Sequence, residues 1–205
     1  MIVLTAVVLR DAMPLDAEVA RRDVGPVTVL YEETAEAPSQ ARSAIVEHGQ
    51  RIVALAERVP MLPIRYGTTV ADDDELLELV GMHVDEWSRR LAQLAGRCEL
   101  VVHLDLRDVA PRTGPIESGR AYLEARRERL RRHDDAVADV RRVLAPWADE
   151  SRLLPDGRRL AVLVERTEAA AACEAVATWG DEQPDIAVVV SGPWPPFSFC
   201  EEPEQ

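Results

Sequence analysis

The sequence contains no lysine and no asparagine, and its basic residues are all arginine. Both missing amino acids have AT-rich codons, so a GC-rich genome explains their absence without a functional cause. Cysteine is also scarce. The three cysteines, Cys98, Cys173 and Cys200, are far apart and form no CxxC pair. This spacing argues against a zinc site or a disulfide framework, and it predicts three reduced thiols in a cytosolic protein.

Sequence motifs for phosphate binding and nucleophilic catalysis are also missing. The chain has only 10 glycines and contains no GxGxxG, Walker A or GxSxG sequence, so we expect no cofactor and no enzyme of those classes. Residues 2–9 form an apolar run, but the run is too short to span a membrane and lacks the flanks of a signal peptide. We therefore interpret it as a strand buried on both faces, and we expect no membrane partner.

The residues that are present indicate a globular, acidic protein. Hydrophobic residues make up 47% of the chain, which is enough for a packed core, although aromatic residues contribute only 4%. The formal net charge is −13. Such a charge repels phosphate backbones, so nucleic acid is not an expected partner.

The first half of the chain, residues 1–96, is predicted to be a small α+β domain. Apolar runs predict strands, and apolar residues spaced by three and four predict amphipathic helices. The predicted strands are residues 2–9, 27–31 and 62–66; the predicted helices are residues 39–59 and 72–95, with one or two helical turns within 15–22. An acidic start at residues 72–74 and Gly96 bound the second long helix.

Residues 97–205 are predicted to form a second domain, which has a ferredoxin-like βαββαβ order of elements. Its predicted strands are residues 98–107, 153–154, 160–164 and 186–191; its predicted helices are residues 117–148, bent near Pro146, and 168–178. A turn rich in Pro and Gly at residues 111–115 precedes the long helix, and Asp156-Gly157 indicates a hairpin. The predicted fold class is α+β with two small α/β domains.

Three histidines are candidates for metal binding or acid–base chemistry. His103 and Asp105, with Glu99, alternate on one face of the strand at residues 98–107, a pattern that could hold a metal or an acid–base pair. A solvated sheet face explains it better, because no HxH or HExxH motif supports a metal site. His48 and His133 each lie in an apolar helical stripe, where a histidine hydrogen-bonded at the edge of the core is the usual occupant.

An arginine-rich run is the one basic concentration in the chain. It consists of Arg120, Arg126, Arg127, Arg129, Arg131 and Arg132. Glu124 and Glu128 lie three or four residues from several of these arginines, so a salt-bridged solvated face is the favoured interpretation. A docking face for an acidic partner, or for the acidic half of this same protein, is the alternative.

The segment SGPWPPFSF, residues 191–199, follows the last predicted strand. Its three prolines impose an extended path, and its aromatic residues are too apolar to remain free in water. We expect most of these side chains to pack back on the domain as a fixed arm, with an aromatic patch for a partner as the alternative.

Three motifs in this chain resemble those of the gas vesicle protein GvpF/GvpL family. The GPWPPFSF segment resembles its C-terminal signature, carried by Gly192, Pro193, Trp194, Pro195, Pro196, Phe197 and Phe199, with Phe197 where Tyr is usual. MLPIRYGT resembles the family's "lPmRFGT" stretch, carried by Pro63, Arg65, Tyr66, Gly67 and Thr68. SGRAYLEARR resembles its "GxAYLxxRR" helix start, carried by Gly119, Ala121, Tyr122, Leu123, Arg126 and Arg127.

The resemblance implies a non-catalytic accessory protein of gas vesicle formation, in the cytoplasm and at the gas vesicle. Its implied partners are the hydrophobic major shell protein and other accessory proteins. We expect transient binding of the shell protein through the N-terminal domain or the cleft between domains. The alternatives are an enzyme using His103 and Asp105, and a ligand-binding regulatory module of the ferredoxin-like type. The motifs do not distinguish an F from an L type.

Overall fold

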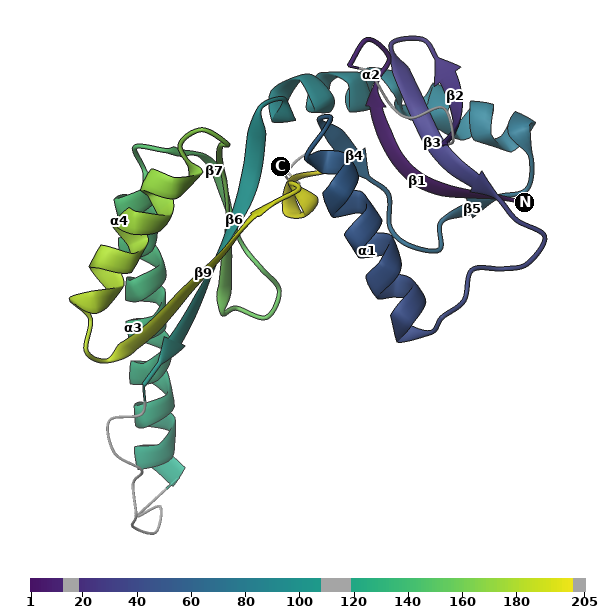
Figure 1. The fold of residues 1–205 in the computed structure, drawn as a ribbon. Helices are drawn as coiled ribbons and strands as arrows, with labels where there is room; N and C mark the ends of the chain where they lie inside the picture. The colour runs from purple at the N-terminus through teal and green to yellow at the C-terminus, as the bar shows by residue number, and fades with distance from the viewer. Residues whose placement is uncertain (13–18, 108–118, 201–205) are drawn as a thin grey trace. The chain divides into compact units, whose positions relative to one another are not determined.

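The computed structural model describes residues 1–12, 19–107 and 119–200, and the chain divides into two compact units (Figure 1). Unit 1 comprises Met1–Arg97 together with the C-terminal segment that starts at Trp194, and unit 2 comprises Cys98–Pro193. The described residues form two antiparallel sheets and four α-helices. The predicted α+β class is therefore confirmed.

Unit 1 is built on a five-stranded antiparallel sheet with the strand order β2-β3-β1-β4, in which β5 also pairs with β1. Its elements are β1 (Ile2–Leu9), β2 (Ala20–Val24), β3 (Val27–Glu33), α1 (Arg42–Ala56), β4 (Met61–Pro63), β5 (Thr69–Val70) and α2 (Asp73–Leu94). The central position of β1 follows from its sequence, since a strand whose residues are apolar except for Thr5 must be covered by neighbours.

The core of unit 1 covers both faces of β1. Ala6 and Val8 pack in one apolar cluster with Leu30 of β3 and Ile52 of α1. Val7 points to the opposite face and is also buried, and α2 contacts the strands of this sheet. The prediction of a strand buried on both faces at residues 2–9 is confirmed.

Helix α2 begins as its sequence predicts. Asp72 is the N-cap residue, and its carboxylate accepts a hydrogen bond of 3.0 Å from the Glu75 backbone N–H. The carboxylate of Glu75 accepts in turn from the Ala71 N–H at 2.6 Å, which resembles a capping box. Gly96 follows the helix with a φ of 75°, a conformation that allows the chain to reverse into the next strand.

The helical turns predicted within residues 15–22 are wrong for residues 20–22, which belong to β2; residues 13–18 lie outside the described part. Strand β2 has the polar sequence ARRDV and no apolar alternation. It is extended because it pairs with β3, from Ala20 opposite Tyr31 to Val24 opposite Val27. This pairing is a tertiary effect that local sequence does not encode.

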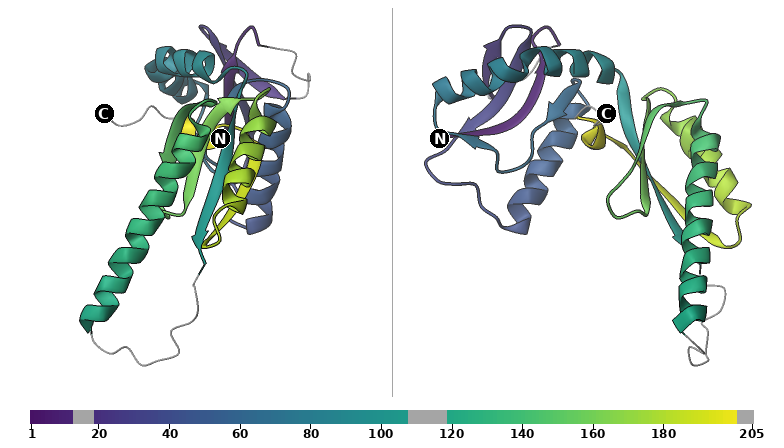
Figure 2. Two further views of the ribbon diagram at one scale, coloured as in Figure 1. Left: turned by 90° about the vertical axis from the view of Figure 1, so that its left-hand side faces the viewer. Right: turned by 180° about the vertical axis from the view of Figure 1, so that it is seen from behind.

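Unit 2 has the element order β-α-β-β-α-β and a four-stranded sheet with the strand order β7-β8-β6-β9. Its elements are β6 (Arg97–Leu106), α3 (Gly119–Leu144), β7 (Ala148–Leu153), β8 (Arg159–Glu165), α4 (Ala169–Asp181) and β9 (Ile186–Trp194). Both helices lie on the same side of the sheet (Figures 1 and 2).

The core of unit 2 lies between this sheet and its two helices. Cys98, Leu100, Val102 and Leu104 of β6 are buried, as their alternation predicts. They pack with α3 through Val140 and Leu144, with β8, and with α4. Burial also raises the pKa of the Cys98 and Cys173 thiols, which favours their protonated forms.

The long helix was predicted to bend near Pro146 and continue to residue 148, and this is wrong. Helix α3 ends at Leu144, and the Trp147 N–H donates a 2.9 Å hydrogen bond to the Leu144 carbonyl. Proline has no N–H to donate, so Pro146 ends the helix. The chain then enters β7, which pairs with β8 across the predicted Asp156-Gly157 hairpin. The predicted helix start at residue 117 and the turn at 111–115 lie outside the described residues.

Among the helices that the structure describes, none is long and apolar enough to cross a membrane.

Candidate functional site

The MLPIRYGT motif forms a tight loop between β4 and β5, along the edge of β1. The Ile64 N–H donates to the Thr5 carbonyl at 2.9 Å, and the Leu4 N–H donates to the Thr68 carbonyl at 2.9 Å. Inside the loop, the Arg65 carbonyl accepts from the Thr68 N–H and hydroxyl at 3.1 and 2.8 Å. Pro63 ends β4, and the Arg65 side chain is exposed.

Gly67 lies at the point of this loop where the backbone is left-handed, with a φ of 85°. Residues with a Cβ adopt this conformation at a cost, whereas glycine does not. No neighbouring atom would touch a Cβ at this position. The glycine of the motif is therefore explained by backbone conformation, not by a shortage of space.

Tyr66 connects the motif loop to α1. Its hydroxyl donates a 2.9 Å hydrogen bond to the Ser39 carbonyl, and its ring lies 5.1 Å from the ring of His48. His48 is buried, and no described residue hydrogen-bonds to its Nε2. Burial lowers the pKa of His48, although a hydrogen bond with the Ile64 backbone opposes the shift. These contacts fit a structural histidine that holds α1 against the motif loop.

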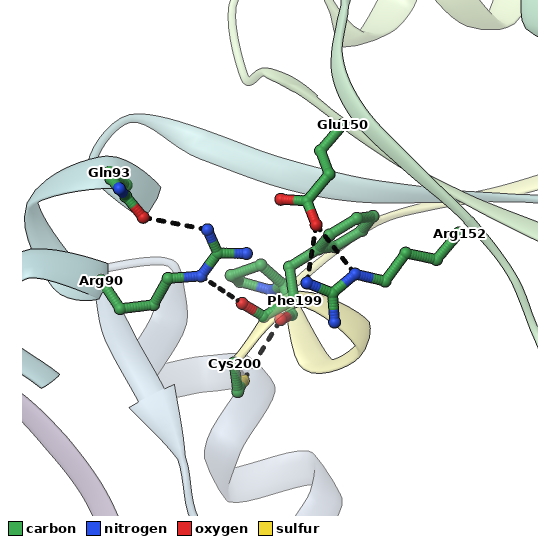
Figure 3. A network of polar contacts seen from close by, with 7 residues as sticks. Arg90, Gln93, Glu150, Arg152, Phe199 and Cys200 are labelled. Atoms are coloured by element: carbon green, nitrogen blue, oxygen red, sulfur yellow. Dashed lines mark hydrogen bonds and ion pairs between the residues drawn. The ribbon is translucent and has the colours of Figure 1, made fainter. Parts of the chain in front are cut away.

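The C-terminal segment is anchored in unit 1, whereas the sequence placed it in the second domain. Phe199 is fully buried, and its carbonyl accepts a 2.6 Å hydrogen bond from the Arg90 Nε (Figure 3). The Arg90 Nη1 also donates to the Gln93 Oε1 at 3.0 Å. The Cys200 thiol donates to the Pro196 carbonyl at 3.2 Å, which closes the final turn. A buried guanidinium thus fixes the backbone of the segment.

Two aromatic side chains of the same segment stay partly exposed. Trp194 and Phe197 are 40% and 44% exposed, in contrast to Phe199. Phe197 and Phe199 lie in one short 3₁₀ turn, where the Phe199 N–H donates to the Pro196 carbonyl at 3.0 Å. Part of the predicted arm is therefore packed, and part of it presents an aromatic surface.

These two aromatic residues and one face of α1 border an open groove of about 470 Å³, which we call the aromatic groove. Its other lining residues are Val46, Gly49, Gln50, Val53, Ala54 and Glu57. On α1, Val46, Gly49 and Val53 are three and seven residues apart and share one side of the helix. Gly49 leaves space, since no atom lies within 4 Å of where its Cβ would be. The groove offers apolar contact with few polar partners, which suits an apolar segment better than a polar metabolite.

A second cavity of unit 1, about 510 Å³ in volume, is lined by both apolar and charged residues. Leu55 and Tyr31 are among its apolar lining, and Glu32, Arg51 and Arg58 are among its charged lining. Arg51 forms an ion pair with Glu32, so two of these charges already neutralise each other. The lining of this cavity is therefore more mixed in polarity than that of the aromatic groove.

The third motif lies in unit 2, on the first turns of α3. Gly119 is the first residue of the helix, and Tyr122, Arg126 and Arg127 are exposed. Gly192 and Pro193 also belong to unit 2, at the end of β9, where their peptide bond is cis. The structure thus places the motif residues Pro63–Gly67 and those from Trp194 onward in unit 1, and the others in unit 2.

The three candidates on β6, His103, Asp105 and Glu99, lie in different environments, and His103 is half-buried. Glu99 is buried, whereas Asp105 is exposed and lies 3.6 Å from the Arg158 Nη1. Across the ranges that the structure describes, no group of three or more His, Cys, Asp or Glu side chains could hold a metal ion.

Sequence reasoning missed the aromatic groove and Arg90. The spacing of Val46, Gly49 and Val53 was available as a signal, but the stripe through His48 and Ile52 on another face of α1 was more continuous. Ile45, three residues before His48 on that stripe, is 45% exposed. Arg90 had no sequence signal, because its partner is a backbone carbonyl 109 residues away.

Comparisons with known proteins relate the chain to one family. A family profile described as "Gas vesicle synthesis protein GvpL/GvpF" matches residues 15–201. Two crystal structures are similar in fold: gas vesicle protein GvpF from Microcystis aeruginosa (TM-score 0.77, 14% identity, 98% of this chain and 99% of that chain) and GvpF from Anabaena sp. PCC7120 (TM-score 0.79, 16% identity, 99% and 97%). No curated protein sequence matches the chain.

Proposed function

The chain belongs to the gas vesicle synthesis protein GvpL/GvpF family, and from this premise we propose that it is a non-catalytic accessory protein of gas vesicle assembly. In this proposal it binds the hydrophobic major shell protein, alongside other accessory proteins, and acts in the cytoplasm and at the growing vesicle. The observation that carries the proposal is the aromatic groove, which is formed in part by residues of the family's C-terminal motif.

The chemistry of the groove supports this role. A shell that excludes water requires very apolar subunits, and such subunits aggregate unless a soluble protein covers their apolar surface. Trp194 and Phe197 supply large apolar area with few rotatable bonds, while α1 leaves open space at Gly49. Helix-in-groove recognition uses this combination of an apolar trough and aromatic borders.

The net charge of −13 supports the same role. A strongly charged protein stays soluble and does not self-associate readily, even when it carries an exposed apolar surface. A complex of this chain with an apolar subunit would therefore remain in solution until the subunit is delivered.

We also propose that unit 2 is a ferredoxin-like domain and that the two domains are residues 1–96 and 97–205, with the C-terminal arm packed on the first. The strand order β7-β8-β6-β9 and two helices on one face support the ferredoxin-like description.

Complementation in a gas-vesicle-forming cell tests the proposal. Deleting the gene should abolish vesicles by electron microscopy, and the tagged wild-type chain should restore them and co-purify with the shell subunit. The double substitution W194A/F197A should lose both effects. L77A/M82A removes two exposed apolar side chains of α2 instead and should behave as wild type. Restored vesicles with no retention of the shell subunit would contradict the binding role.

The same complementation assay distinguishes a non-catalytic role of the chain from an enzymatic one. H103A/D105A should form vesicles normally if the chain is non-catalytic. Loss of vesicles with an intact fold would favour the enzyme alternative.

A further inference from the structure

The apolar stripe by which helix α3 packs on the core of unit 2 continues along the helix beyond that core. In its C-terminal half, Val137, Val140 and Leu144 are buried against the sheet. Its N-terminal turns extend past the sheet and α4 in all three views of Figures 1 and 2. There Tyr122, Leu123 and Leu130 are 49%, 54% and 56% exposed. Leu130, on the same side of the helix as Val137, is therefore outside the core.

These exposed apolar residues share one side of the helix with two arginines. At about 100° per residue, Tyr122, Leu123, Arg126, Arg127 and Leu130 fall within an arc of about 140°. Glu124 and Glu128 fall on the opposite side. We call these five residues the α3 face; it contains apolar and basic side chains and no acidic one.

The arginines outside the α3 face are largely neutralised by partners. Arg120 pairs with Glu124 at 2.8 Å and Arg131 with Glu128 at 2.8 Å, within the helix. Arg132 pairs with Asp185 at 3.1 Å.

Arg126 and Arg127, by contrast, have no polar partner among the residues that the structure describes. The favoured interpretation of the sequence, a fully salt-bridged surface, therefore does not hold for this side of α3.

We propose that the α3 face binds an acidic amphipathic helix of a partner protein. The exposed stretch of α3, residues 119–132, is about 20 Å long, which suits a helix of four turns. Leu123 and Leu130 are seven residues apart, the repeat at which two packed helices present apolar residues to each other. Arg126 and Arg127 lie between them and would pair with carboxylates flanking the apolar stripe of the partner.

Charge selects this occupant over the others. Two chains of net charge −13 repel each other, which disfavours a second copy. Nucleic acid would meet the same field, and on the α3 face only Arg126 and Arg127 would offset it. An acidic helix gains from these arginines and keeps its other charges in water. This surface is in unit 2 and is distinct from the aromatic groove, so the inference does not depend on shell-protein binding.

The test uses the full-length chain and two labelled helical probe peptides of 18 residues. Both peptides have Leu every three and four residues; one carries Glu at the flanking positions and the other carries Lys. Fluorescence anisotropy should show binding of the Glu peptide, weakening as salt rises, and at least about tenfold weaker binding of the Lys peptide.

Two matched charge variants locate the binding. R126Q/R127Q should weaken binding of the Glu peptide about tenfold, whereas R141Q/R142Q, which removes two arginines from the last turn of the same helix, should leave it unchanged. L123S/L130S should also weaken it. Circular dichroism and thermal unfolding should show all variants folded, because the substituted residues lie outside the core.

Three results would overturn the proposal: no binding of the Glu peptide, equal binding of both peptides, or equal weakening by the two arginine pairs. Sedimentation equilibrium of the chain alone tests whether a second copy of the chain occupies the α3 face. A dimer that R126Q/R127Q dissociates would assign the α3 face to a second copy and would also overturn the proposal.

Discussion

His48 is a residue at which burial and charge conflict. Its imidazole is buried beside Tyr66, and burial lowers its pKa below the ordinary value of 6.5. The neutral form is therefore favoured in the folded protein. As pH falls below about 6.5, the unfolded chain takes up a proton more readily than the folded chain, so stability contributed at neutral pH is lost toward the lower folded pKa.

We therefore expect wild-type unit 1 to lose more stability between about pH 7.5 and pH 5.5 than the H48F variant, which keeps an aromatic ring without the titration. Urea unfolding followed by tryptophan fluorescence measures this difference. Identical pH dependence of stability in wild type and H48F would show that His48 does not cause the loss at low pH.

Gly67 adopts a left-handed backbone conformation, whereas Gly49 lies within helix α1, so replacing the two glycines should have opposite effects. Alanine at Gly67 must adopt a positive φ, so G67A should destabilise unit 1 by about 1–2 kcal/mol. G49A places a methyl group in open space on a helix and should stabilise it by about 0.5–1 kcal/mol. Hydrogen exchange of β1 in the two variants gives both values. A neutral G67A would contradict the explanation of the motif loop.

The C-terminal segment acts as a structural element of unit 1. Phe199 is fully buried and Phe197 is nearly half exposed, so the same substitution at two neighbouring sites should have different effects. We expect F199A to cost about 3–5 kcal/mol and F197A less than about 1 kcal/mol. Hydrogen exchange should place the F199A loss in β1 and β3 and leave β8 protected. Loss confined to β8 would instead place the segment in unit 2.

At this scale the sequence predicts most elements and misses those whose cause is distant. Strands β1 and β6 and helix α2 carry strong local signals: continuous apolar residues, strict alternation, and an acidic cap. Strand β2 has none, because its conformation comes from pairing with β3. The end of α3 at Leu144 could have been predicted from Pro146, but this proline was interpreted as the site of a bend.

The candidate site was predictable only in part. The motif residues Trp194 and Phe197 were selected from the sequence, and they border the aromatic groove. Their companions Val46 and Gly49 lie about 145 residues away in the chain, and no local pattern connects them. The anchor of the segment, Arg90, is equally remote. The composition of the C-terminal segment thus located one wall of the groove, and tertiary packing supplied the other.

At the scale of the whole molecule, an acidic chain presents apolar contact surface at defined places. The aromatic groove lies on unit 1 and the α3 face on unit 2, and they differ in charge. In our proposals, an apolar shell subunit binds the first and an acidic helix binds the second. This division would allow one accessory protein to bind a subunit and an assembly partner at the same time.

The most direct test is whether the groove keeps the shell subunit in solution. Denatured shell subunit is diluted into buffer that contains the purified chain, and the subunit left in the supernatant after centrifugation is measured. Gly49→Trp fills the groove. Gly81→Trp is the matched control, since Gly81 is also a helical glycine with open space around its Cβ position. We predict that wild type and Gly81→Trp keep the subunit soluble and that Gly49→Trp does not; equal protection by all three proteins would contradict the groove as the binding site.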